Sequence, residues 1–572
     1  MRIQRLASMI FTALAALAQK PCGNSPANAP CDIAFDGPAK AEVWAEFRAP
    51  DFKTYRLAAF HDGTRLVFRV NPVTAGEWTY RISGNVAALD GKIDKFTAAA
   101  NTEATPFIRR ANAHHWQDVE KQQPHLYMGA DFDPATLEAR AAQHFTHLAI
   151  PIFSPTQDPG FYRKIDEQVA SINAKGMVAD LILAPTPAAL ERAFPTWQQR
   201  EAYLRFITGR YSAFNVSWWL AEEWESSPNG RAVLKELGLA LKKLDPYAHP
   251  RSTRAAFTSS PLGPDGWMDH TVYGTAAPEA LPAVEHIQNT VPQVVALDAG
   301  LPPDLFRKRL WNTSMSGAYL FLAGRAPADS PNALAMAAWH EFFSKRTRYW
   351  DLQPFFDLDG ARALAIAGLK DGDGDELFQA VEYIAYVEHP AQFELRVFKH
   401  SYDVWWVNPS TGEAVKEKKD WKGDVWRGTP PDATRDWVLH LSRDGKKEGM
   451  LKSYKFESWP IPVQEPARDA KAAPFELVVP PADATLVAGK PVNYTIKLKK
   501  QTAGTRRMTY VLSGEIVRDG QGNRFLAAGP EGSFTIPASA LTGGPGVINF
   551  RVAALNAPGK LYVIDSVFNV AK

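Results

Sequence analysis

Between residues 125 and 347 the chain alternates short apolar runs with stretches of helical pattern, and this alternation constrains the fold most strongly. The apolar run 125–131 is followed by Asp133-Pro134, which is typical of a helix start, and by a helix-favouring stretch over 136–143. Eight such strand–helix units occupy about 225 residues, the usual size of a (β/α)8 barrel. Successive units of this kind favour parallel strands. An open doubly wound sheet is the alternative, although no GxGxxG motif follows the first strand.

The expected elements of this region follow from the same periodicity. We predict strands over residues 125–131, 146–153, 177–184, 216–223, 251–257, 268–273, 293–298 and 317–322. We predict helices over residues 136–143, 161–174, 197–211, 231–244, 304–315 and 333–347.

Both flanks of the barrel have β patterns. Short alternating runs such as 41–47 and 65–70, separated by turn residues, indicate an N-terminal β-sandwich. After residue 355 we expect strands over 382–387, 393–398, 402–407, 492–498 and 547–552, in two C-terminal β-domains of which the last is Ig-like. The predicted organisation is a signal peptide (1–18), a linker (19–31), an N-terminal β-sandwich (32–104), the (β/α)8 TIM barrel (105–350), a C-terminal β-domain (351–460), a second linker (461–473) and an Ig-like β-sandwich (474–572).

The first eighteen residues have the pattern of a secretory signal peptide. Two arginines precede the apolar run 6–17, and residues 16–18 fit a small-residue cleavage site. The run is too short for a membrane span, and no other apolar run approaches eighteen residues. We therefore expect a secreted or periplasmic protein without a transmembrane segment. Export would permit a disulfide between Cys22 and Cys31, with two free thiols as the alternative.

Charge and motif content exclude several classes of function. The 64 basic and 62 acidic residues leave a net charge of +2, which gives no general attraction for nucleic acid or anionic lipid. No CxxC pair, GxSxG motif or P-loop is present, and His340-Glu341 lacks the second histidine of HExxH. The acidic run 371–376 imitates an EF-hand loop but has Glu376 where that loop requires glycine. We expect no metal and no cofactor.

A (β/α)8 barrel carries its active site at the carboxyl ends of its strands, so the residues at those positions are the candidates. Several are carboxylates and aromatics, a combination that suits glycoside hydrolysis, in which one carboxyl protonates the leaving oxygen and a second attacks or activates water. The candidate catalytic pair is Glu223, after the fourth strand, and Asp298, at the end of the seventh. The candidate substrate contacts are Asp131, Trp219, Glu222, Trp224, Arg254, His270 and Tyr273.

Each candidate also has a structural alternative. Glu222, Glu223 and Glu225 could begin a solvated helix, since acidic residues favour helix N-termini. Asp298 could cap its own loop, and Asp131 could orient one by hydrogen bonds. Tryptophans are more often core residues than sugar-stacking surfaces.

The run Trp218-Trp-Leu-Ala-Glu-Glu223 resembles the W-x-L-(G/A)-(N/E)-E signature of clan-A retaining glycoside hydrolases. The resemblance implies that Glu223 is the general acid/base, with Glu222 in place of the usual asparagine. Three further stretches resemble the apiosidase-like branch of these enzymes. Residues 59–80 resemble its N-terminal sandwich, residues 306–319 the helix before its strand eight, and residues 402–413 its collagen-binding-type C-terminal β-domain.

The seventh strand departs from that family pattern. Enzymes of the family end this strand in a nucleophilic glutamate, whereas here residues 294–300 are Val-Val-Ala-Leu-Asp-Ala-Gly. Asp298 is one methylene shorter, and Ala299 would supply no nucleophile. The first hypothesis is a secreted glycoside hydrolase that acts on a polysaccharide or oligosaccharide. The alternatives are a non-catalytic carbohydrate-binding protein on a degenerate barrel and a surface adhesin. The oligomeric state stays open.

Overall fold

The structure is a computed structural model of the chain. It describes residues 21–23, 25–101, 107–110, 114–119, 121–277, 279, 281–288, 291–355, 358–359, 361–366, 382–391, 393–442, 468, 471 and 490, together with eight strands between 475 and 571. The expected signal peptide and the acidic run 371–376 lie outside these residues. No helix within the described ranges is long and apolar enough to cross a membrane.

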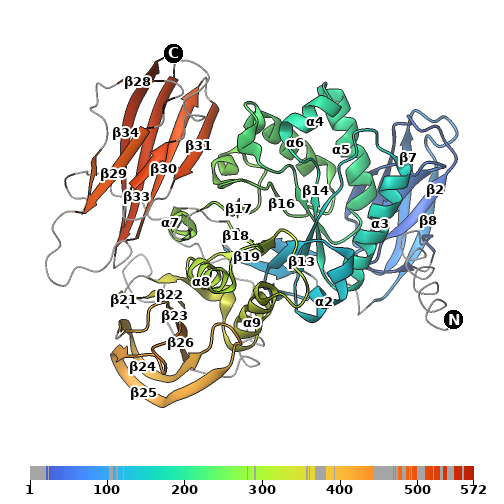
Figure 1. Cartoon of the computed structure of the whole chain (residues 1–572). Coiled ribbons are helices and arrows are strands. Elements are labelled where there is room, and N and C mark those ends of the chain that lie inside the picture. The colour runs from blue at the N-terminus through green and yellow to red at the C-terminus, as the bar shows by residue number, and fades with distance from the viewer. Residues whose placement is uncertain are drawn as a thin grey trace, which may run out of the picture.

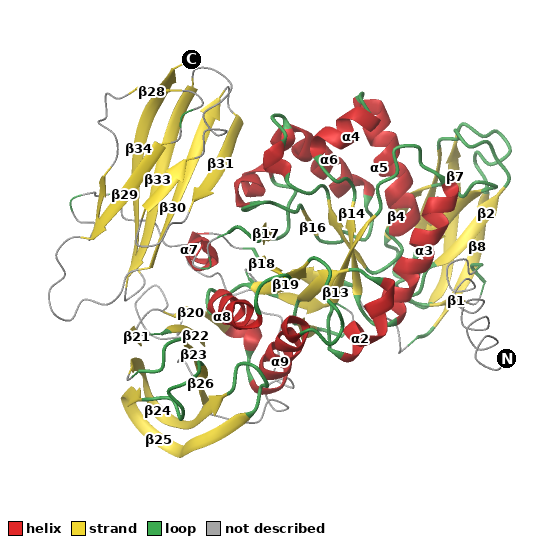
Figure 2. Ribbon diagram, viewed as in Figure 1, coloured by secondary structure: helices red, strands yellow, loops and turns green. Residues whose placement is uncertain are grey.

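Eight parallel strands form the central sheet, which confirms the predicted TIM barrel (Figures 1 and 2). The strands are β12 (Met128–Asp131), β13 (His147–Pro151), β14 (Val178–Ile182), β15 (Val216–Trp219), β16 (Arg251–Ser252), β17 (Thr271–Tyr273), β18 (Gln293–Asp298) and β19 (Tyr319–Ala323). Their order in the sheet is β16-β15-β14-β13-β12-β19-β18-β17, so the first and last strands of the barrel pair with each other.

The circle closes between β16 and β17 without a regular ladder. The backbone N–H of Asp269 donates to the carbonyl of Arg251 at 2.8 Å, and the Ser252 hydroxyl donates to the carbonyl of His270 at 2.7 Å. These two bonds form what we call the β16–β17 seam. The strands at the seam are only two and three residues long, shorter than the predicted runs 251–257 and 268–273.

Helices surround the strands, as Figure 2 shows. They are α2 (Leu137–Ala142), α3 (Pro159–Ala174), α4 (Pro187–Ala193), α5 (Trp197–Tyr211), α6 (Gly230–Leu244), α7 (Leu281–Gln288), α8 (Pro303–Ser314) and α9 (Pro331–Arg346). Local sequence sets their starts: Asp158 caps α3, and Thr196 with Gln199 forms a capping box at α5. The fifth strand is followed by a 3-10 segment, η3 (Ser260–Asp265), instead of an α-helix.

The N-terminal β-sandwich packs beside α3 and α5 (Figure 1). One sheet has the order β1-β8-β7-β3-β4 and the other β2-β6-β5. The strands are β1 (Ser25–Pro26), β2 (Cys31–Phe35), β3 (Val43–Arg48), β4 (Thr54–Ala58), β5 (Phe60–His61), β6 (Leu66–Val70), β7 (Gly76–Gly84) and β8 (Ile93–Ala99). A small sheet, β9 (Ile108–Arg110), β10 (Trp116–Asp118) and β11 (Gln123–His125), leads into the barrel.

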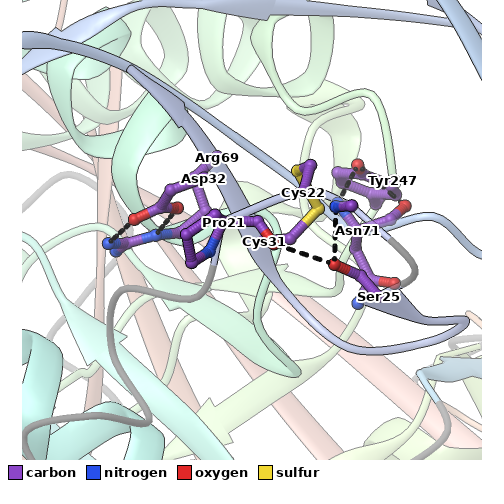
Figure 3. The surroundings of a disulfide bond; sticks show 9 residues. Pro21, Cys22, Ser25, Cys31, Asp32, Arg69, Asn71 and Tyr247 are labelled. Atoms are coloured by element: carbon purple, nitrogen blue, oxygen red, sulfur yellow. Dashed lines mark hydrogen bonds and ion pairs between the residues drawn. A yellow bond between two sulfur atoms is a disulfide. The ribbon is translucent and has the colours of Figure 1, made fainter. Parts of the chain in front are cut away.

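Polar contacts join the sandwich to the barrel. Arg69 of β6 forms an ion pair with Asp32 at 2.8 Å and donates to the backbone carbonyl of Arg210 on α5 at 3.1 Å. The disulfide Cys22–Cys31 lies in the same region, and Figure 3 shows it close to Arg69 and Asp32. It ties the segment before β1 to the start of β2.

The remaining strands lie beyond the barrel. One sheet contains β20 (Leu352–Phe355), β21 (Leu358–Asp359), β22 (Arg362–Ile366), β23 (Glu382–Val387), β24 (Phe393–Val407), β25 (Ala414–Gly428) and β26 (Trp437–Ser442). The two separate strands predicted over 393–398 and 402–407 are one strand, β24, with irregular register between Arg396 and His400. Two further sheets contain β27 (Phe475–Val478), β28 (Thr485–Val487), β29 (Val492–Leu498), β30 (Thr509–Arg518), β31 (Gln521–Ala527), β32 (Ser533–Ile536), β33 (Gly546–Asn556) and β34 (Lys560–Ala571).

Candidate functional site

An arginine links two carboxylates at the carboxyl ends of the barrel strands. Arg254 Nη1 donates to Asp131 Oδ1 at 2.9 Å and to Glu222 Oε1 at 2.7 Å. Arg254 Nη2 adds a bond of 3.2 Å to Asp131 Oδ2, which also accepts from the Gly324 amide at 2.6 Å. Burial alone would lower the pKa of Arg254, but the two carboxylates outweigh it and raise that pKa. Arg254 and the two carboxylates therefore connect the ends of four strands at the barrel mouth, namely β12, β15, β16 and β19.

Aromatic rings lie beneath this arginine. The Arg254 guanidinium lies 4.9 Å from the ring of Phe321 and 5.7 Å from the ring of Trp219, and the two rings are 5.3 Å apart. Trp219 is buried, and its indole N–H has no hydrogen-bond partner. Trp219 thus forms the floor under Arg254 and is not an open stacking surface.

Glu223 is exposed and has left-handed backbone angles of φ 45° and ψ 49°. Such angles are uncommon outside glycine and often mark functional positions. The turn is held by Ser226, whose amide and hydroxyl donate to the Glu223 carbonyl at 2.9 and 2.7 Å. Glu223 is thus an exposed carboxylate that directly follows the Arg254-bound Glu222.

Trp224 and Glu225 organise the adjoining loops. Trp224 is buried, and its indole N–H donates to the Thr258 carbonyl at 3.2 Å, so the predicted substrate contact is a core residue. The Glu225 carboxylate accepts from the amides of Ala256, Phe257 and Thr258 at 3.1 to 3.3 Å. Burial raises the pKa of Glu225 against the effect of these amides. Glu225 therefore fixes the loop that follows Arg254, a role that sequence analysis did not assign.

Asp298 lies exposed at the end of β18 and binds its own loop. Its Oδ1 accepts from the Gly300 amide at 2.8 Å. The next residue, Ala299, continues the strand pairing through its amide, which donates to the Ala323 carbonyl at 2.9 Å. Among the described residues, no hydrogen bond or ion pair joins Asp298 to Glu223. Asp298 therefore caps its own loop, which was the structural alternative to its catalytic role.

His270 and Tyr273 lie away from the mouth, contrary to their prediction as substrate contacts. His270 precedes β17, at the opposite end of the strand, and its buried ring lies 5.1 Å from that of Trp116. Burial lowers the pKa of His270 to about 3. The Tyr273 hydroxyl donates to Glu285 of α7 at 2.7 Å and accepts from Gln293 at 2.8 Å. The Tyr273 side chain therefore faces the helix layer.

A buried polar network inside the barrel was missed. Asp180 of β14 accepts from the Tyr127 hydroxyl at 3.0 Å and contacts His147 Nδ1 at 2.9 Å. The chain continues from His147 Nε2 to His125 Nε2 at 3.0 Å and from His125 to Asp118 at 3.0 Å. Burial would raise the pKa of Asp180, but His147 and the hydroxyl donors lower it. An aspartate within the apolar run 177–184 was the signal that could have revealed this network.

The described residues contain no group of three or more His, Cys, Asp or Glu side chains arranged to hold a metal ion.

No protein-family model matches the sequence, and no curated protein matches it either. Solved structures match the fold. A protein from Bacteroides vulgatus ATCC 8482 assigned as a glycoside hydrolase superposes with a TM-score of 0.58 at 14% identity, covering 74% of this chain and 100% of the other. A second glycoside hydrolase gives a TM-score of 0.50 at 11% identity, covering 60% of this chain and 98% of the other. The chain thus shares the fold of these two structures, in a multi-domain arrangement.

Proposed function

We propose that the protein is a glycoside hydrolase that acts on a polysaccharide or an oligosaccharide. The observation that carries the proposal is the pair Asp131 and Glu222, bridged by Arg254 at the strand ends beside the exposed Glu223. Barrel enzymes place their catalytic residues at this end. The glycoside hydrolase fold of the structural neighbours supports the same reaction class, by analogy of fold alone.

In the proposed reaction Glu223 protonates the glycosidic oxygen as the leaving group departs. A second carboxylate attacks the anomeric carbon or activates water, and Asp298 is the candidate at strand seven. The Gly300 amide orients the Asp298 carboxylate without covering it, since the residue is exposed. Arg254 holds Asp131 and Glu222 as fixed acceptors, which suits them to bind sugar hydroxyls.

The proposal extends to family and location. The resemblance of residues 59–80 and 402–413 supports membership of the apiosidase-like branch. The disulfide Cys22–Cys31 supports a secreted or periplasmic protein, because such bonds persist in oxidising compartments.

A specific observation favours a second candidate, a non-catalytic carbohydrate-binding protein. Asp298 caps its own loop, and the following position is Ala299. If neither supplies a nucleophile or a base, the mouth retains the groups for binding but not for hydrolysis.

The test is sugar release from a panel of polysaccharides and aryl glycosides by wild type, Glu223→Gln and Asp298→Asn. Glu223→Gln should lose about 10²–10⁴-fold on poorly activated leaving groups and far less on dinitrophenyl glycosides, which need no proton. Glu167→Gln, on the exposed face of α3, is the matched control and should retain full activity.

Two results would contradict the proposal. Equal release by wild type and Glu223→Gln would remove Glu223 from the mechanism. No release by any variant, with the protein still retarded in polysaccharide gels, would establish the binding protein instead.

A further inference from the structure

A groove lies between the N-terminal sandwich and the helix layer of the barrel, away from the strand-end mouth. Its walls are the start of β3, the β4–β5 turn, the β13–α3 loop and α5, and its volume is about 420 Å³. Figure 1 shows the sandwich strands beside α3 and α5, where this groove is situated. The volume is within the range of about 300–1,000 Å³ typical of small-molecule sites.

One wall carries an aromatic ring outside any core. The burial pattern of β3 alternates, with Val43, Ala45 and Phe47 in the sandwich core and Trp44 half-buried on the opposite face. Trp44 is one of the lining residues of the groove, and the Arg56 guanidinium, which is not part of the lining, lies 4.5 Å from its ring. A half-exposed indole beside polar groups is suited to the apolar face of a sugar ring.

The polar groups of the groove offer both donors and acceptors. Arg205 of α5 forms an ion pair with Glu42 across the two walls at 2.8 Å, which neutralises both charges. His61 Nδ1 accepts from the Gly63 amide at 3.2 Å, so in the neutral ring Nε2 carries the proton and can donate. Lys40 adds one exposed charge. Because Arg205 is paired with Glu42, the lining keeps one net positive charge, that of Lys40, beside several hydrogen-bonding groups, so it favours a ligand rich in hydroxyls and of low charge.

Small side chains create the space, and one of the lining loops begins at the mouth end of the barrel. Five of the lining residues are alanines, whose short side chains leave room for a ligand. Gln157 lines the groove from the β13–α3 loop and has a left-handed φ of 52°. That loop leaves the carboxyl end of β13, the end at which the mouth lies.

We propose that this groove is a carbohydrate-binding site for a neutral oligosaccharide chain, with Trp44 as the stacking residue and Arg205, Glu42 and His61 as hydrogen-bonding groups. This second binding site goes beyond the proposed function, because binding in the groove requires no catalysis at the mouth.

The experiment is affinity gel electrophoresis of the full chain in a Glu223→Gln background, so that hydrolysis cannot remove the ligand. The probes are hydroxyethylcellulose, arabinoxylan and galactomannan as neutral polymers and polygalacturonate as an acidic one. At least one neutral polymer should retard the protein, and Trp44→Ala should weaken that binding at least tenfold. Trp44→Phe, which keeps a ring, should retain part of it.

Trp405→Ala is the matched control. Trp405 is also half-buried under a guanidinium, that of Arg346 at 4.6 Å, but lies on β24 outside the groove. Equal binding by the Trp44→Ala and Trp405→Ala proteins would overturn the proposal. Retardation by polygalacturonate alone, or by none of the four polymers, would overturn it too. A protein that binds through Trp44 yet hydrolyses nothing would support this site while contradicting the proposed hydrolase.

Discussion

Replacing His270 should make the barrel less sensitive to acid. Its ring is buried, neither ring nitrogen has a hydrogen-bond partner, and burial lowers its pKa from 6.5 to about 3. Asp180 favours the charged ring and His147 opposes it, but neither outweighs burial. Below pH 6.5 the His270 ring is therefore protonated in the unfolded chain but stays neutral in the folded state. The contribution of His270 to the free energy of unfolding is fully present above pH 6.5 and is lost as the pH falls toward the pKa of the folded state.

The size of the effect follows from this difference in pKa. At pH 5 the unfolded imidazole is protonated and the folded one is neutral, which costs about 2 kcal/mol of unfolding free energy relative to pH 7.5. His270→Leu removes that contribution. Because His114, His115 and His286 are also buried with lowered pKa values, the wild type should lose more than this single contribution.

The assay is urea unfolding at pH 7.5 and pH 5.0, followed by tryptophan fluorescence. The loss on acidification should be about 2 kcal/mol smaller for His270→Leu than for wild type. His389→Leu, which removes an exposed histidine, should match wild type. An unchanged pH dependence in His270→Leu would show that His270 is hydrated or protonated in the folded protein, and the reasoning would fail.

Three other changes have expected outcomes. Arg254→Leu should abolish sugar release and lower the free energy of unfolding by about 1–2 kcal/mol. The loss is smaller than for a fully buried ion pair because both carboxylates reach solvent. Activity assays and melting curves would measure the two effects, and unchanged sugar release would contradict the prediction. Gly238→Ala should cost about 1–3 kcal/mol, since a Cβ there would clash with the indole of Trp267; a melting temperature equal to that of wild type would refute the clash. Replacing Cys22 and Cys31 by alanine should destabilise the sandwich by about 2–3 kcal/mol through loss of the loop closure, and equal urea midpoints for variant and oxidised wild type would argue against it.

The barrel was predictable because its signal is repeated eight times along the chain. The predicted helices over 161–174 and 197–211 correspond to α3 and α5, where capping residues mark the starts. The seam region was harder to predict. Strands of two and three residues carry too little periodicity to define their ends, so the directions of His270 and Tyr273 could not be derived.

The candidate site, too, was predictable only in part. The rule that parallel strands end at one edge predicted that Asp131, Glu222 and Arg254 would lie near one another, and the structure brings them into contact. That one guanidinium bridges both carboxylates depends on side-chain geometry between distant strands, which a sequence does not contain. The same holds for Trp219, whose burial under Arg254 results from packing against Phe321.

The β16–β17 seam divides the barrel into two unequal arcs. The first runs from β12 to β16 and the second from β17 to β19, and within each arc neighbouring strands are joined by regular ladders. The arcs share one regular ladder, β12 with β19. At the seam the described residues add the two bonds above and an ion pair between Arg251 and Asp269 at 2.8 Å. A ribosome synthesises all of the first arc before any of the second. The segment between them is mostly buried or half-buried, but Gly263 and Pro264 are exposed, so this turn is the natural place to split the chain into two fragments that reassemble when mixed.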